Sequence, residues 1–115
     1  MRVVAAVRPA TTLINELGGS AANPPAGQQW LLVEALVICS GSGNCAPDLS
    51  GIRVVGSSGA TYAPAPDFSM PQLFGPGAYA VGQVWGYMGF TIPTSETTLR
   101  LALNQGGQTY TFALG

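Results

Sequence analysis

The sequence predicts an all-β domain of about seven or eight short strands. Its 16 Gly and 9 Pro residues are spread along the 115 positions and divide the chain into short segments. Those segments are rich in Val, Ile, Leu, Thr, Tyr and Trp, which favour strands, and none sustains an amphipathic pattern of helical period. So many strands in a chain long enough for one domain indicate a sandwich or a barrel over residues 1–115.

The expected strands follow from the breaks between them. Pro9 ends the first strand, and the stretch after it allows at most a helical turn at residues 12–17, before Gly18 and Gly19. The longest apolar run, QQWLLVEALVIC, is the expected central strand. The expected strands cover residues 2–8, 28–39, 51–55, 60–63, 78–92, 97–103 and 108–114.

Two of these strands carry apolar side chains on both faces. Because alternate residues of a strand share a face, Phe90 lies with Met88 and Ile92, opposite Trp85 and Tyr87. The outer face of a sandwich strand is usually polar, so a second apolar face has to be covered. The central strand places Leu31, Val33, Ala35 and Val37 on one face, and Trp30, Leu32, Leu36 and Ile38 on the other with Glu34.

Three coverings of this second face remain open. Residues 10–25 or 64–76 can fold over it. A protein partner or a second copy of the chain can pack on it. A sugar or an apolar ligand can stack on its aromatic rings. The candidate partner or ligand surface therefore comprises Trp85, Tyr87 and Trp30.

Cys39 and Cys45 are separated by flexible Ser, Gly and Asn residues in the segment CSGSGNC. A zinc site needs four ligands, and a thioredoxin-like pair has two residues between its cysteines. Two Cys at this spacing and no His provide neither. We expect a local disulfide, which is typical of an oxidising compartment; two reduced thiols are the alternative.

The charges exclude two classes of partner. The net charge is −1, and Arg2, Arg8, Arg53 and Arg100 are the only cationic side chains. Four dispersed arginines supply neither the clustered charge of a nucleic-acid site nor a polybasic membrane patch. The sequence shows no signal peptide and no apolar stretch long enough for direct membrane insertion. If the protein is exported, we expect that its targeting segment has been removed and that Met1 is an added start.

Catalysis is not expected. A chain without His or Lys cannot assemble the usual Ser or Cys nucleophile with its base. The five carboxylates, Glu96 among them, are isolated in sequence and are interpreted as solvated surface charges rather than a glycosidase pair. Asn44 and Asp48 are better explained by local turn bonding than by calcium. The sequence thus predicts no cofactor and no metal.

The stretch FGPGAYAVGQVWGYMGFTIP resembles a signature of bacterial extracellular immunoglobulin-like domains of unknown function, described as telokin-like and related to a secreted immunoprotective antigen. The matching positions are Pro76-Gly77, Gly86, Phe90 and Pro93, and the resemblance covers about residues 1–114. It implies an immunoglobulin-like antiparallel two-sheet β-sandwich outside the cytoplasm, commonly in lipoproteins. The family brings no catalytic residues, and its lipid-attachment cysteine is missing here.

Together these features predict a non-catalytic interaction or structural module of an exported bacterial (lipo)protein, secreted or anchored at the cell surface. The alternative is a carbohydrate- or small-ligand-binding domain that uses its surface aromatics. A flat apolar patch favours the first, and a concave aromatic floor with a polar rim favours the second.

The disulfide is directly testable. If Cys39 and Cys45 are bonded to each other as expected, titration of the denatured, unreduced protein with a thiol reagent should detect no free thiol. Two free thiols in protein prepared under oxidising conditions would refute the pairing and remove one of the reasons to expect export.

Overall fold

The structure is a computed structural model that describes residues 2–38, 44–45, 51–65, 68–70, 80–81, 83–105 and 107–114. Its strands agree with the expected all-β class. In chain order, the elements are β1 (Arg2–Val7), α1 (Thr11–Glu16), β2 (Ser20–Ala21), β3 (Gln28–Ile38), β4 (Asn44–Cys45), β5 (Ile52–Gly56), β6 (Thr61–Tyr62), β7 (Phe68–Ser69), β8 (Ala80–Val81), β9 (Gln83–Pro93), β10 (Leu99–Gln105) and β11 (Gln108–Ala113).

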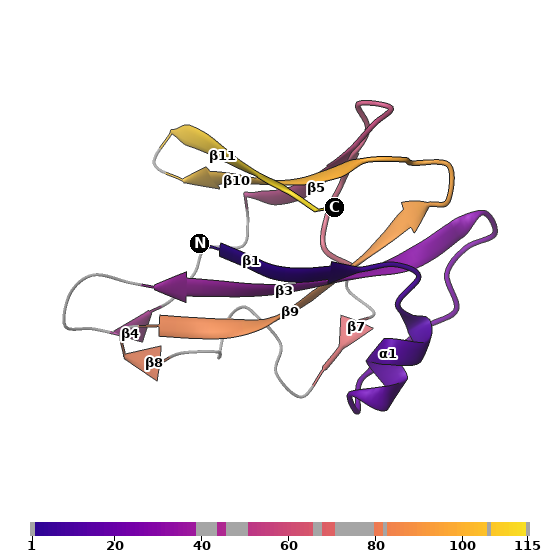
Figure 1. Cartoon of the computed structure of the whole chain (residues 1–115), viewed down its shortest axis with the longest axis horizontal. Helices are drawn as coiled ribbons and strands as arrows, with labels where there is room; N and C mark the ends of the chain where they lie inside the picture. Colours follow the sequence, from indigo (N-terminus) through magenta and orange to yellow (C-terminus); the bar gives the residue numbers. More distant parts are fainter. Residues whose placement is uncertain are drawn as a thin grey trace.

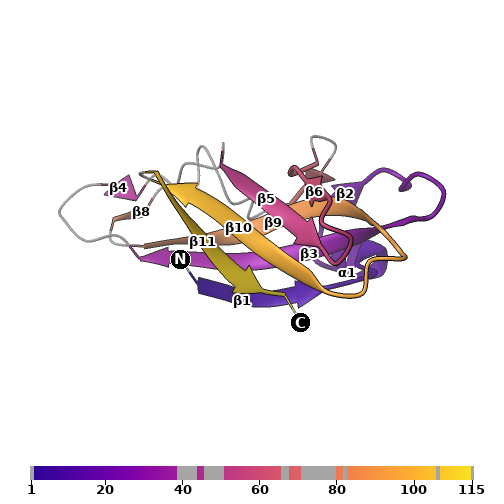
Figure 2. The same cartoon turned by 90° about the horizontal axis from the view of Figure 1, so that it is seen from above.

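Two antiparallel sheets face each other (Figure 1). One has the strand order β1-β3-β9, and the other has the order β11-β10-β5-β6. Seen from above, β10 and β11 lie over β1 and β3 (Figure 2). The short pairs β2–β7 and β4–β8 lie outside these two sheets, so the expected strand over residues 78–92 is divided between β8 and β9.

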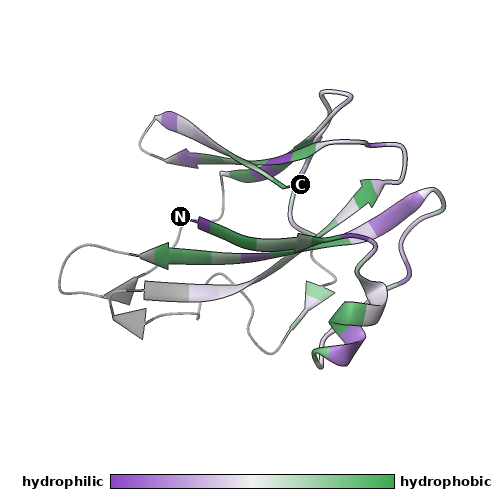
Figure 3. Cartoon of the chain, in the orientation of Figure 1, coloured by the Kyte–Doolittle hydropathy of each residue, from purple (hydrophilic) through white to green (hydrophobic). Residues whose placement is uncertain are grey.

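The main core fills the space between the two sheets. Phe90 is fully buried there beside Met88 and Ile92, as the strand pattern predicts. The leucines of β10 alternate with outward-facing residues. They pack from the opposite sheet against the buried side chains of β9. Apolar stretches run along β1, β3 and α1, whereas the start of β3 is polar (Figure 3). The core comprises Leu31, Val33, Ala35, Ile52, Val54, Met88, Phe90, Ile92, Leu99, Leu101, Leu103 and Leu114.

A second, smaller core lies on the outer side of the β1-β3-β9 sheet. Trp30 and Leu32 of β3 are covered there by Ile14 of α1 and by Phe68 of β7. The Phe68 ring packs directly over Gly89, where an added Cβ would lie 2.4 Å from it, so only glycine leaves room for this contact. Within the described residues, no helix has the length and apolar character needed to cross a bilayer.

Glu96, in the loop between β9 and β10, is buried, which corrects its interpretation as a solvated charge; only 5% of it is exposed. Its carboxylate accepts hydrogen bonds from Ser57 Oγ (3.2 Å), the Ser58 backbone N–H (3.0 Å), Ser58 Oγ (2.8 Å) and Tyr62 Oη (2.8 Å). A Cβ on Gly56 would lie 1.6 Å from Glu96 Oε2, so this approach also requires glycine. The carboxylate thus holds the β5–β6 hairpin to the β9–β10 loop.

Arg8 extends this connection to the end of β1. Its Nη1 donates to the Glu96 carbonyl oxygen and its Nη2 to that of Thr97, both at 2.8 Å. Burial acts to raise the pKa of Glu96, but hydrogen bonds from Tyr62, Ser58 and Ser57 outweigh it and hold the pKa below its ordinary value. The charged form of Glu96 therefore belongs to the folded state.

Glu96→Gln is expected to lower the urea midpoint of unfolding at pH 7, because the neutral amide turns an NH₂ group toward hydroxyl and N–H donors. The folded pKa of Glu96 lies below the unfolded value of roughly 4.3. Its contribution is therefore complete above that pH and is lost as the pH falls through the folded pKa. The difference between wild type and variant should shrink as the pH falls below the unfolded pKa of roughly 4.3.

Glu16→Gln is the matched control, because Glu16 is an exposed carboxylate at the end of α1. This change should move the midpoint little at any pH. A Glu96→Gln variant that behaves like Glu16→Gln would show that the hydrogen-bonded carboxylate does not stabilise the fold.

Candidate partner-binding groove

Three rows of side chains cross the outer face of the β1-β3-β9 sheet. Directly paired residues of antiparallel strands project from the same face. A single carboxylate, that of Glu34, therefore stands at the centre of a largely apolar surface. The rows are Arg2–Leu36–Trp85, Ala5–Glu34–Tyr87 and Val7–Leu32–Gly89.

A β-bulge in β1 widens this surface. The register with β3 shifts between Val3 and Ala5, so Val4 and Ala5 are consecutive exposed residues. Val3 and Ala6, on either side of them, pack against the main core. The bulge thus lets one short edge strand contribute apolar side chains to both faces.

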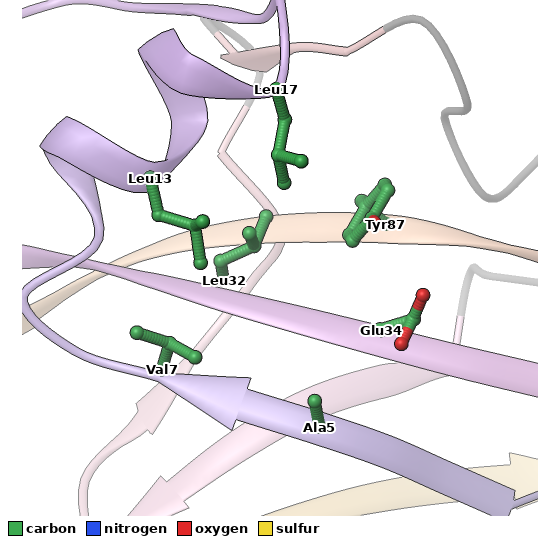
Figure 4. Close-up of a pocket in the computed structure, with 7 residues that line it drawn as sticks. All are labelled: Ala5, Val7, Leu13, Leu17, Leu32, Glu34 and Tyr87. Carbon is green, nitrogen blue, oxygen red and sulfur yellow. The ribbon is translucent and has the colours of Figure 1, made fainter.

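Helix α1 forms one wall of a hollow on this face (Figure 4). Leu13 of α1 and Leu17, the residue that follows the helix, lie one turn apart and point toward Leu32 and Tyr87 of the sheet. Gly18, with φ of 84°, follows directly and ends the helix. The hollow has a volume of about 220 Å³ and is lined by Ala5, Val7, Leu13, Leu17, Leu32, Glu34 and Tyr87.

A second hollow of about 220 Å³ adjoins the first. It is lined by Val4, Glu34, Leu36 and Trp85. Glu34 lines both hollows, and we refer to the two together as the outer groove. The groove therefore runs from α1 to Trp85, with a carboxylate at the junction of its two halves.

Exposed apolar side chains concentrate in the outer groove. The described residues include five large hydrophobic ones that are exposed. Val4, Val7, Leu17 and Trp85 line the groove, and the fifth, Tyr110, lies on β11 of the other sheet. Trp85 is 41% exposed. Such clustering on one face is typical of an interaction surface rather than of scattered surface hydrophobics.

The two aromatic rings of the groove are in contact with each other. The Trp85 and Tyr87 ring centroids are 5.7 Å apart, and the rings meet edge to face at 78°. Burial raises the pKa of the Tyr87 phenol, and the charge of Glu34 and a hydrogen bond to it raise this pKa further. Tyr87 therefore stays protonated at neutral pH, beside the Glu34 residue with which it is paired across β3 and β9.

The structure brings Trp85 and Tyr87 together but removes Trp30 from the predicted surface. Only 2% of Trp30 is exposed, and its Nε1 donates to the Ala22 carbonyl oxygen at 2.7 Å. Its ring packs 5.9 Å from that of Phe68. Its assignment to the surface is wrong, because the chain itself covers this end of the face.

The cysteine prediction lies outside the described residues. Cys39 is not described, and only the backbone of Cys45 is described, in β4. The disulfide therefore stays a prediction.

Sequence reasoning missed Leu13 and Leu17 as groove residues, although their spacing of one turn in the expected helical segment indicated that they share a face.

Comparison with known proteins identified no relative of this chain. No family model matches the chain, and neither the curated proteins nor the solved structures contain a match. The candidate site therefore rests on the chain's own geometry, in which two aromatic rings, a carboxylate and a helix wall define one groove.

Proposed function

We propose that the protein is a non-catalytic binding module whose outer groove takes an apolar segment of a partner protein. The observation that carries this proposal is the concentration of exposed apolar side chains along the groove, with Trp85 at one end. Trp is among the residues that contribute most to binding energy at protein interfaces. The groove presents it on a paired strand, so its backbone needs no ordering when a partner binds.

The strand order supports an immunoglobulin-like identity for the two sheets. In chain order, β1, β3 and β9 correspond to strands A, B and E of that fold. On the same basis, β5, β6, β10 and β11 correspond to strands C, C′, F and G of the opposite sheet. This correspondence agrees with the family resemblance of the sequence.

A location outside the cytoplasm, as part of an exported protein, belongs to the same proposal. It is supported by the expected Cys39–Cys45 disulfide and by the family resemblance. Charged residues make up only 8% of the chain, so repulsion between molecules contributes little to solubility. A partner that covers the apolar groove would remove the surface most prone to self-association.

Carbohydrate binding is the second candidate, and the Trp85–Tyr87 pair favours it. A sugar also presents several hydroxyl groups, each of which loses a hydrogen bond to water unless the site replaces it. Among the described lining residues, the polar side-chain groups are the Glu34 carboxylate, the Tyr87 phenol and the Trp85 indole N–H. The apolar remainder of the lining is better matched by a peptide.

Random short peptides displayed on phage are expected to yield sequences that bind the wild-type protein. Trp85→Ser should weaken their binding by about thirtyfold or more, corresponding to the roughly 2 kcal/mol of an interface hot spot. The fold should persist, because Trp85 lies outside both cores. Fluorescence anisotropy of labelled peptides gives the Kd, and circular dichroism checks the fold.

Tyr110→Ser is the matched control, since Tyr110 is 47% exposed but lies on β11. It should leave the peptide affinities unchanged. The proposal fails if no peptide is selected, or if Tyr110→Ser weakens binding as much as Trp85→Ser. A glycan that binds only when Trp85 is present, without any selected peptide, would favour the second candidate.

A further inference from the structure

The carboxylate of Glu34 limits which partner can occupy the outer groove. Glu34 lines both hollows, so a segment that fills the groove necessarily covers it. Removing water from an unpaired carboxylate is costly, whereas a paired and hydrogen-bonded one is tolerated. For a wholly apolar segment or a lipid chain, the cost of covering Glu34 would therefore cancel much of the binding free energy gained by burying its apolar surface.

The chain itself provides little compensation for this charge. Arg8 is engaged with backbone carbonyl oxygens of the β9–β10 loop, and Arg53 and Arg100 belong to the opposite sheet. Arg2 lies on the same face, in the row that contains Trp85. Among the described residues, Arg2, Arg8 and Arg100 form no ion pair with Glu34. The neutral phenol of Tyr87, the cross-strand partner of Glu34, lies beside this charge but does not neutralise it.

The surroundings of Glu34 suit a cationic side chain in particular. Tyr87 stands beside it in the same row, and Trp85 lines the same hollow. Aromatic rings attract cations, and a guanidinium can stack on a ring while it donates two hydrogen bonds to a carboxylate. The aliphatic part of such a side chain would pack on Leu36 and Val4.

We infer that the partner segment places one cationic side chain, arginine in preference to lysine, against Glu34 between the two apolar halves of the groove. This inference rests on the proposed function, because it names the chemistry of the segment that the groove binds. Recognition then has two parts. Apolar side chains on both sides supply affinity, and the cation at the centre supplies register and specificity.

The test uses a peptide selected by display on the wild-type protein and a copy in which its arginine is replaced by citrulline, a neutral side chain of the same shape. The wild-type protein should bind the arginine peptide about tenfold or more tightly than the citrulline peptide, as expected for a hydrogen-bonded ion pair. Glu34→Gln should lose most of this discrimination and keep at most the few-fold preference that the aromatic rings give a cation. Glu16→Gln, which alters an exposed carboxylate on α1, should still discriminate between them.

The outcomes separate this inference from the proposed function. Two results would overturn the inference: selected peptides that share no arginine or lysine, or discrimination that is undiminished in Glu34→Gln. Binding that still depended on Trp85 would then keep the groove as a docking site. The citrulline comparison on the wild-type protein needs no variant, so it decides the question even if Glu34→Gln fails to fold. A wild-type dimer that Trp85→Ser dissociates and Glu34→Gln does not would assign the groove to a second copy with no cation needed at Glu34, and this result would also overturn the inference.

Discussion

The pairing of β3 with β9 is the constraint on which the rest of the structure depends. Both strands are apolar on both faces, so their register decides which side chains enter the core and which form the outer surface. Leu31 is paired with Phe90 on the inner face, and Leu32 with Gly89 on the outer face. A slip of one residue would exchange the two sets. The core and the outer groove are therefore two consequences of one register.

The second apolar face is divided between the chain itself and the solvent. At one end, α1 and Phe68 cover Trp30, and Gly89 gives the Phe68 ring the space to do so. At the other end, Val4 and Trp85 stay exposed. The Glu96 and Arg8 hydrogen bonds join the two sheets at the loop that follows β9. One face of the sheet is thus covered by the chain itself at one end and forms the proposed binding surface at the other.

Local sequence patterns predicted the features that depend only on the alternation of residues along a strand. The alternation of residues placed Phe90 in the core and Trp85 on the opposite face, and the leucines at 99, 101 and 103 on one buried face. Trp30 was misassigned because its burial depends on the docking of α1 and Phe68, segments far apart in sequence. Glu96 was misjudged for the same reason, since its donors come from a distant hairpin. The bulge in β1 depends on its register with β3, which a single strand does not reveal.

The division of the outer face can be measured directly, because the chain contains only two tryptophans. Trp30→Phe and Trp85→Phe each leave one of them as the fluorophore, and acrylamide quenching reports the access of a small polar solute to its indole. We expect Trp85 to be quenched several-fold more strongly than Trp30, with an emission maximum at longer wavelength. Equal quenching of the two, or stronger quenching of Trp30, would contradict the account of an outer face covered at one end and open at the other.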